Sequence, residues 1–200
     1  MSRRGTYAKG AAKREEILAV ALEVVAKNGC RKATTSEIAE RVGLTQPGLM
    51  HYFSSREELY EEVLRARDGR DIAEYYAPNP GFEGFLAVIR HNTEVPGLVQ
   101  LYAEFAAEAS IAGHPAHDFF VERYAWVRGL IAEALERAQE EGEMGLDLDV
   151  AEAADLIVAT SDGLQVEWLH DPTINMADRL ARVWELLRRS SWWASDPRAA

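Results

Sequence analysis

The stretch from residue 34 to residue 53 constrains this chain more than any other part of its sequence. Ser36 is suited to cap a first helix, and Gly43 is suited to the left-handed conformation that ends it. The apolar residues between them recur at helical spacing: Ile38, Ala39 and Val42. Thr45 then stands where a second helix would be capped, with Pro47 in its first turn, where a missing N–H costs nothing. This order predicts a helix-turn-helix, whose second helix enters the major groove of DNA.

The residues that follow sharpen this prediction, since a capped helix after a glycine turn also fits a plain helical hairpin inside a larger bundle. His51, Tyr52 and Phe53 end the second helix. Ser55 and Glu58 then have the spacing of a capping box, which predicts that another helix begins here.

The run from 42 to 59 resembles the signature of the TetR family of bacterial transcriptional regulators nearly residue for residue. That signature passes from valine-glycine through a capping Ser or Thr and a short polar helix to His-Tyr-Phe and Ser-Lys-Glu-Glu-Leu. The resemblance implies an all-α fold, with an N-terminal three-helix helix-turn-helix DNA-binding domain and a C-terminal helical domain for ligand binding and dimerisation. The sequence departs from the signature at Met50, where the family usually has Tyr.

Carried over position by position, the resemblance implies a set of DNA contacts. Hydroxyls and exposed N–H groups at two helix starts would bind phosphates, and the Gln46 amide would bond adenine. Small residues after Gln46 let the helix backbone approach the bases, and Arg56 replaces a phosphate-binding Lys. The predicted DNA-binding residues are Thr35, Thr45, Gln46, Pro47, Gly48, His51, Tyr52 and Arg56.

The charge of the chain is unevenly divided. The 200 residues carry a net charge of −11, but residues 1–70 hold 13 Lys or Arg against 10 Asp or Glu, whereas residues 71–200 hold 9 against 23. A basic N-terminal part (residues 1–70, here called the head) and an acidic remainder are typical of two domains with different partners. No run of 18 apolar residues and no apolar signal segment is present, which predicts no membrane contact. The single cysteine, Cys30, fits a reducing, cytoplasmic location.

Four segments are expected along the chain. Residues 1–14 are basic and lack acidic residues, which predicts a flexible arm, either a solvated tail or a binder of phosphates and the minor groove. Residues 11–56 form the helix-turn-helix domain, and residues 57–80 form a connecting helix and a linker broken by two prolines and a glycine. Residues 81–200 form the helical ligand-binding and dimerisation domain.

Beyond the linker the pattern predicts only helices, over 82–91, 96–110, 115–142, 149–170 and 176–193. Aromatic residues recur at helical spacing on two of them. Taken singly, each fits ordinary core packing, but together with the resemblance they favour a cavity for a small, largely apolar molecule. An inward carboxylate would favour a cationic one. The predicted ligand-binding residues are Tyr102, Phe105, Phe120, Tyr124 and Asp162.

The last two helices are expected to form the dimer contact. Small residues on the first of them permit close approach of helices, and two such pairs from two subunits fit a four-helix bundle. The predicted interface residues are Ala154, Ile157, Val158, Ser161, Leu180, Val183, Trp184 and Leu187.

These features predict a homodimeric repressor that binds double-stranded operator DNA and is released by a small-molecule inducer, without a cofactor. Activation is a variant, and the alternative is a helical small-molecule-binding or scaffold protein without specific DNA readout. An enzyme is not expected, because no nucleophile–base pattern, phosphate loop or carboxylate pair has a supporting context. No metal is expected either, since His114 and His117 lie at a helix start where spacing fixes no further ligand.

Overall fold

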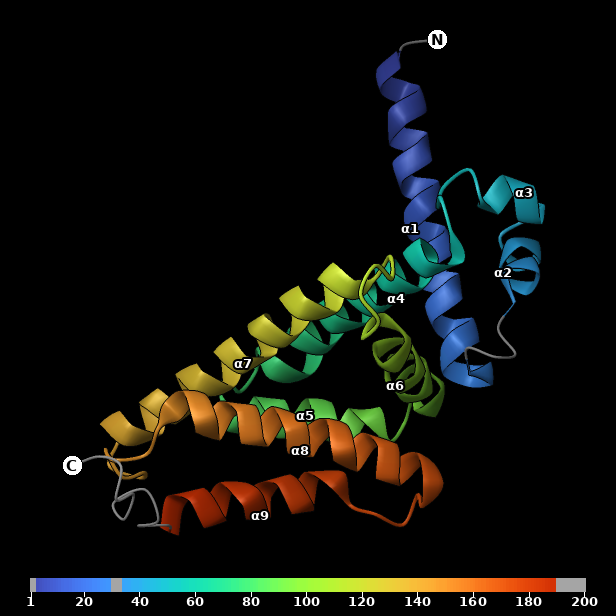
Figure 1. Ribbon diagram of the computed structural model, residues 1–200. Coiled ribbons are helices and arrows are strands. Elements are labelled where there is room, and N and C mark those ends of the chain that lie inside the picture. Colours follow the sequence, from blue (N-terminus) through green and yellow to red (C-terminus); the bar gives the residue numbers. More distant parts are fainter. Residues whose placement is uncertain (1–2, 30–33, 190–200) are drawn as a thin grey trace. The chain divides into compact units, whose positions relative to one another are not determined.

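The computed structural model describes residues 3–29 and 34–189, and over these residues it is all-helical, as the resemblance implies (Figure 1). Cys30 lies outside the described residues. The elements are α1 (Arg3–Asn28), α2 (Thr35–Arg41), α3 (Gln46–Leu49), α4 (Arg56–Asp71), a π-helix η1 (Ile72–Tyr76), α5 (Phe82–Asn92), α6 (Pro96–Ala109), α7 (His117–Glu140), α8 (Val150–His170) and α9 (Met176–Arg189).

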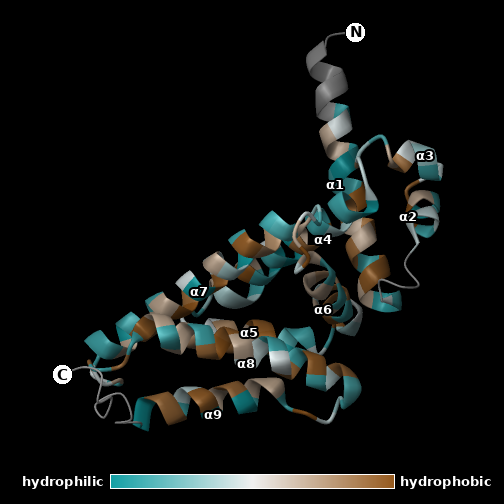
Figure 2. Cartoon of the chain, in the orientation of Figure 1, coloured by the Kyte–Doolittle hydropathy of each residue, from teal (hydrophilic) through white to brown (hydrophobic). Residues whose placement is uncertain are grey.

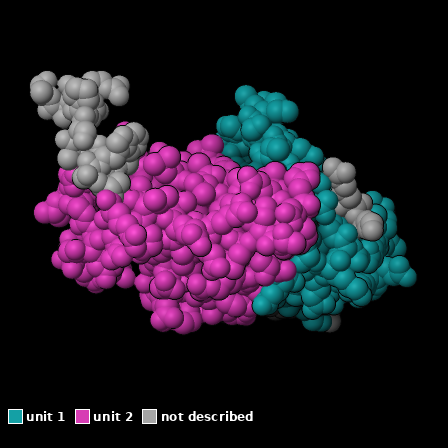
Figure 3. All heavy atoms as spheres, turned by 90° about the horizontal axis from the view of Figure 1, so that it is seen from below, with its two compact units in different colours: residues 1–70, 94–120 teal, residues 71–93, 121–200 magenta. Residues whose placement is uncertain are grey.

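The chain divides into two compact units, which Figure 3 shows in different colours. The first unit comprises residues 1–70 and 94–120, and therefore joins α1 to α4 with α6. The second comprises residues 71–93 and 121–200 and contains η1, α5, most of α7, α8 and α9. The polypeptide thus passes between the units three times.

Helix α1 begins at Arg3, so most of the expected basic arm over residues 1–14 lies within this helix. The segment is rich in Ala, Lys and Arg, all of which favour a helix. Two of its basic side chains bind the first unit itself. The Nζ of Lys13 donates to the carbonyl of Val42 at 2.6 Å, and Arg14 pairs with Glu62 at 2.9 Å.

Helix α6 packs closely on α1, which explains its place in the first unit. A Cβ at Gly97 would overlap the carbonyl oxygen of Val25 and would lie 2.7 Å from that of Ala26. Only a glycine lets the two backbones approach this far. The sequence predicts a C-terminal domain from residue 81 onward, whereas contacts group α6 with the first unit. A pattern of apolar residues does not tell which neighbour a helix packs against.

In the second unit, the prolines and glycine of the expected linker form a turn at 77–81 rather than a longer connection. Helix α4 ends at Asp71 and runs directly into η1, and Gly81, with φ of 110°, precedes α5. Helix α5 packs against η1 and α9, and α9 packs against α8. Figure 2 shows apolar and hydrophilic residues alternating along these helices, as expected for helices with one buried face.

Candidate DNA-binding site

Helix α2 is capped by Thr34, one residue before its first helical position. Thr34 has extended backbone angles (φ −86°, ψ 150°), and its hydroxyl accepts the N–H of Glu37 at 3.1 Å. This corrects the prediction that Ser36 is the cap, because Ser36 already lies inside the helix. A cap must have non-helical angles, and the sequence Thr34-Thr35-Ser36 offers three equally suitable side chains for that position.

The turn and the start of α3 follow the sequence prediction. Gly43 has φ of 68°, and the N–H of Leu44 reaches back to the carbonyl of Ala39 at 2.8 Å, which ends α2. Thr45 caps α3, and its hydroxyl accepts the N–H of Gly48 at 3.2 Å. Figure 1 shows α2 and α3 beside each other on the first unit.

The Gln46 side chain joins the two helices of the motif. Its Nε2 donates to the hydroxyl of Thr35 at 2.9 Å, and its Oε1 accepts the hydroxyl of Ser36 at 3.0 Å. The predicted base-reading side chain is therefore held at the N-terminus of α2. Sequence reasoning missed this link, although a Gln at the start of one helix and a Thr-Ser pair at the start of the preceding one are its visible signal.

All eight predicted DNA-contacting residues are at least partly exposed, whereas the core beneath them is closed. Leu49 and Phe53 are buried, and the guanidinium of Arg14 lies 4.8 Å from the centroid of the Phe53 ring. Arg56 is exposed and lies 4.7 Å from the centroid of the Tyr60 ring, which holds the charge at the start of α4.

The start of α4 uses a capping arrangement that differs in part from the predicted box. The N–H of Glu58 donates to the Ser55 hydroxyl at 3.0 Å, as predicted, but the Glu58 carboxylate accepts the N–H and the hydroxyl of Ser54, both at 2.6 Å. The Ser54 hydroxyl, the Ser54 N–H and then the nearby Arg14 hold the pKa of Glu58 below its ordinary value, because each favours the charged carboxylate.

Comparison with known proteins agrees with this geometry. Residues 17–63, which run from the C-terminal part of α1 to the middle of α4, match the family described as bacterial regulatory proteins of the tetR family. The chain belongs to the TetR family. It is therefore a DNA-binding transcriptional regulator, and the matched residues contain the whole helix-turn-helix.

Full-length relatives extend the similarity of this TetR-family chain beyond the head. The transcriptional repressor KstR2 of Mycobacterium tuberculosis is 29% identical over 150 residues, which cover 69% of this chain and 72% of KstR2. The transcriptional repressor BepR of Brucella suis is 26% identical over 183 residues, covering 84% and 85% of the two chains.

A solved TetR-family regulator from Rhodococcus sp. shares the fold with a TM-score of 0.71 and 24% identity, over 88% of this chain and 99% of that one. Among the described residues of the chain, no helix is long and apolar enough to cross a membrane.

The predicted ligand-binding residues of the TetR-family chain lie in both units. Tyr102, Phe105 and Phe120 are buried in the first unit, with ring centroids 5.9 Å apart for Tyr102 and Phe120 and 5.8 Å apart for Phe105 and Phe120. In the second unit, the Tyr124 hydroxyl donates to Asp162 at 2.7 Å. The three rings thus pack on one another as core.

Most of the predicted dimer residues pack in the interior of the second unit, and their role in a dimer stays a prediction. Five are buried within the protomer, and Trp184 stacks on Phe82 with ring centroids 4.1 Å apart. The buried five are Ala154, Ile157, Val158, Ser161 and Leu180, and the half-buried three are Val183, Trp184 and Leu187.

The two histidines before α7 make local contacts. The Nδ1 of His114 accepts the N–H of Ala116 at 3.2 Å, and the Nδ1 of His117 lies 2.8 Å from the carbonyl oxygen of Ala109. Within the described part of the chain, no three His, Cys, Asp or Glu side chains are grouped so as to hold a metal ion.

Proposed function

We propose that this chain is a homodimeric repressor that binds a palindromic operator and is released by a small-molecule inducer. The relatives KstR2 and BepR are both named repressors. The observation that carries the proposal is the capped α2–turn–α3 motif, which presents Thr45, Gln46 and His51 to solvent above a closed core.

In this proposal, the exposed residues divide into two kinds of DNA contact. Five of them would bind phosphates, which positions α3 in the groove. Thr35, Thr45 and Arg56 lie at helix starts, and His51 and Tyr52 lie in the turn after α3. Gln46 lies at the start of α3 and would read a base edge, with Pro47 and Gly48 leaving room for the approach.

The dimer would form through the exposed face of α8. Leu156, Ala159, Gly163 and Val166 follow one another at alternating steps of three and four residues and are exposed, Leu156 by 47% and Val166 by 46%. Apolar side chains at this spacing form one stripe, and the small residues in its middle permit close approach of a second α8. To bind one operator, the two heads of such a dimer must lie on successive major grooves, about 34–36 Å apart.

Release from the operator would follow from a ligand that favours a dimer whose two heads no longer match the spacing of successive major grooves. A structure of FadR from Thermus thermophilus contains lauroyl-CoA, so a solved relative of this fold binds a small molecule. By linkage, DNA and inducer must weaken each other's binding by the same factor.

Selection of random duplexes by the purified protein, followed by sequencing, tests the proposal. The expected result is an inverted repeat whose half-sites are about one helical turn apart. Absence of enrichment, with binding that is abolished by moderate salt, would instead indicate only nonspecific attraction to phosphates.

A further inference from the structure

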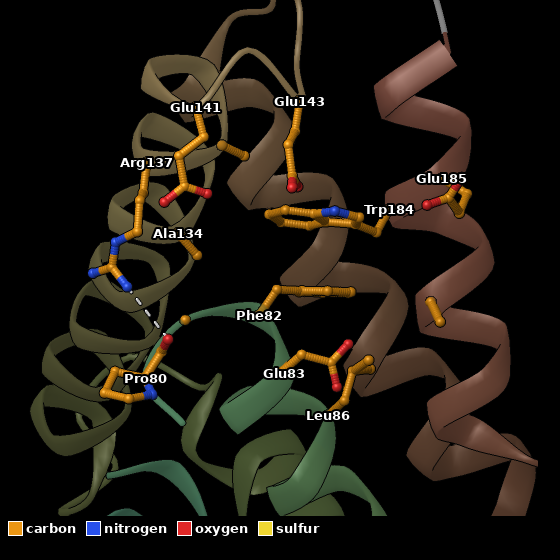
Figure 4. A pocket seen from close by; sticks show the side chains of 13 residues that line it. Pro80, Phe82, Glu83, Leu86, Ala134, Arg137, Glu141, Glu143, Trp184 and Glu185 are labelled. Carbon is orange, nitrogen blue, oxygen red and sulfur yellow. Dashed lines mark hydrogen bonds between the residues drawn. The ribbon is translucent and has the colours of Figure 1, made fainter. Parts of the chain in front are cut away.

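A pocket of about 390 Å³ lies within the second unit, outside the residues that the sequence suggested for ligand binding. It is bounded by the start of α5, the end of α7 and the middle of α9 (Figure 4). Its volume is in the range of pockets that hold small organic molecules. None of Tyr102, Phe105, Phe120, Tyr124 and Asp162 lines it.

The pocket has an aromatic wall. Phe82 and Trp184 stack nearly parallel, with ring centroids 4.1 Å apart and an angle of 14° between the rings. Phe82 is buried by its position at the start of α5, while Trp184 keeps part of its surface exposed. In Figure 4 the Glu143 side chain points toward the side of Trp184 that is opposite Phe82. An indole ring with a carboxylate beside its face is a strong attractor for a cation, since the ring quadrupole and the charge act together.

The rim of the pocket is acidic. Glu83, Glu141 and Glu143 are exposed, and within the described part of the chain their carboxylates accept no hydrogen bond and form no ion pair within 4 Å. Glu143 is nevertheless near enough to Arg188 to contribute to the raised pKa of that guanidinium, after the larger effect of Glu185. The fourth carboxylate, that of Glu185, is already bound, because Arg188 lies 2.8 Å and Arg189 3.4 Å from it. The basic residue of the lining, Arg137, donates to the carbonyl of Pro80 at 3.3 Å.

We propose that this pocket binds an organic cation with an apolar body. The charge would lie between the rim carboxylates and the face of Trp184, and the apolar body would cover the buried floor made by Leu86 and neighbouring alanines. An anion is disfavoured because the lining carries four carboxylates and one guanidinium. A fully apolar neutral molecule would leave the exposed carboxylates without a partner and would gain nothing from them.

As an inducer site, this pocket depends on the proposed ligand-responsive function, but its binding can be measured without DNA. The probe is benzyltrimethylammonium, and the neutral comparison is 3-phenylpropan-1-ol, a soluble molecule of similar size. Titration calorimetry on the full chain is expected to show binding of the cation, at least about fivefold tighter than the alcohol. Raising the salt concentration should weaken the binding of the cation but not that of the alcohol, because salt screens the attraction between the cation and the exposed carboxylates.

Three variants locate the site. The double variant Glu141→Gln and Glu143→Gln removes two charges. It should weaken the binding of the cation at least about tenfold, since both carboxylates act at close range. Glu136→Gln is the control, because Glu136 is an exposed glutamate near the end of α7 that does not line the pocket. Trp184→Leu should abolish the preference for the cation over the alcohol, and thermal unfolding checks that this variant is folded. Equal binding of cation and alcohol, or equal loss in Glu136→Gln and the double variant, would overturn the proposal.

The regulatory role is tested separately, by measuring the affinity of the protein for the selected operator DNA with and without the cation. Failure of the chain to select any operator would count against the proposed repressor function and leave the pocket's affinity for the cation measurable. Operator binding without any cation affinity would overturn the pocket proposal alone.

Discussion

The amide of Gln46 is bound to the hydroxyl of Thr35 at 2.9 Å, which ties the start of α3 to the start of α2. A Gln amide has two N–H donors and two acceptor lone pairs. Thr35 uses one donor and Ser36 uses one lone pair, so one of each is left. One N–H donor and one acceptor lone pair are what a bidentate contact to adenine needs. The two hydroxyls would therefore orient Gln46 before DNA arrives, which reduces the side-chain entropy lost on binding.

Replacement of Gln46 by Ala should change sequence preference more than affinity for DNA in general. We expect discrimination at one base pair of each half-site to fall by about 1–3 kcal/mol, the usual value of a bidentate contact. Tyr52→Phe is the comparison, and it should weaken all sequences by a similar factor because it removes a phosphate contact. Parallel selections with the two variants measure both effects. An equal loss on every sequence from Gln46→Ala would argue that another side chain reads the base.

Gly97→Ala should destabilise the first unit. The added methyl would overlap the carbonyl oxygen of Val25, and backbone atoms cannot move aside as a flexible side chain can. A cost of about 1–3 kcal/mol in the free energy of unfolding is expected, as for other overpacked sites. Gly10→Ala in α1 is the control, because nothing lies within 4 Å of its Cβ, and it should stabilise by about 0.5–1 kcal/mol. Urea unfolding measures both changes, and a neutral Gly97→Ala would show that α6 can retreat from α1.

The local structure of the head could be predicted because its signals are short-range. Gly43, Thr45 and Pro47 each act on groups within three or four residues, so their order in the sequence is enough to place the turn and the start of α3. The cap of α2 was misplaced by two residues because neighbouring hydroxyls at 34, 35 and 36 satisfy the same local rule. The basic segment 1–14 carries two signals, a positive charge that favours a solvated arm and a composition that favours a helix, and α1 includes it from Arg3 onward.

The contacts of the second unit could not be predicted in the same way. Phe82 and Trp184 stack although about half of the chain separates them, and no local rule pairs two distant aromatic residues. Periodicity locates the apolar stripe that contains Ile157, but it does not tell whether the core of the protomer or a second subunit buries that stripe. The exposed stripe beside it, with Leu156 and Val166, gives a weaker apolar pattern in the sequence because its middle residues are Ala and Gly.

Adjacent residues of α8 should therefore respond differently to substitution. Leu156→Glu places a charge on the exposed stripe and should shift the protein from dimer to monomer, with little effect on the fold of the protomer. Ile157→Ala should leave the dimer intact but lower the free energy of unfolding by about 2–5 kcal/mol, since Ile157 is fully buried in the second unit. Sedimentation velocity reports the first change and thermal unfolding the second. A monomeric Ile157→Ala at full stability would return the interface to the buried face.

The capping carboxylate of α4 should make the stability of the head depend on pH. Ser54 and then Arg14 lower the pKa of Glu58 in the folded state below its ordinary value of 4.5. The stabilisation is therefore complete above about pH 4.5, and it is lost as the pH falls through the lower folded-state pKa, because the unfolded state then binds the proton first. Glu58→Gln should lower the urea midpoint at pH 7, and its difference from the unmodified chain should shrink toward zero near pH 3.

Glu57→Gln is the control for this pH dependence. It shares the first turn of α4, and so the effect of the helix dipole, but Glu57 makes none of the bonds to Ser54. The difference between the two variants at pH 7 isolates the contribution of the Ser54 bonds. If Glu58→Gln and Glu57→Gln lowered the midpoint equally at every pH, the dipole rather than the hydrogen bonds would account for the stabilisation.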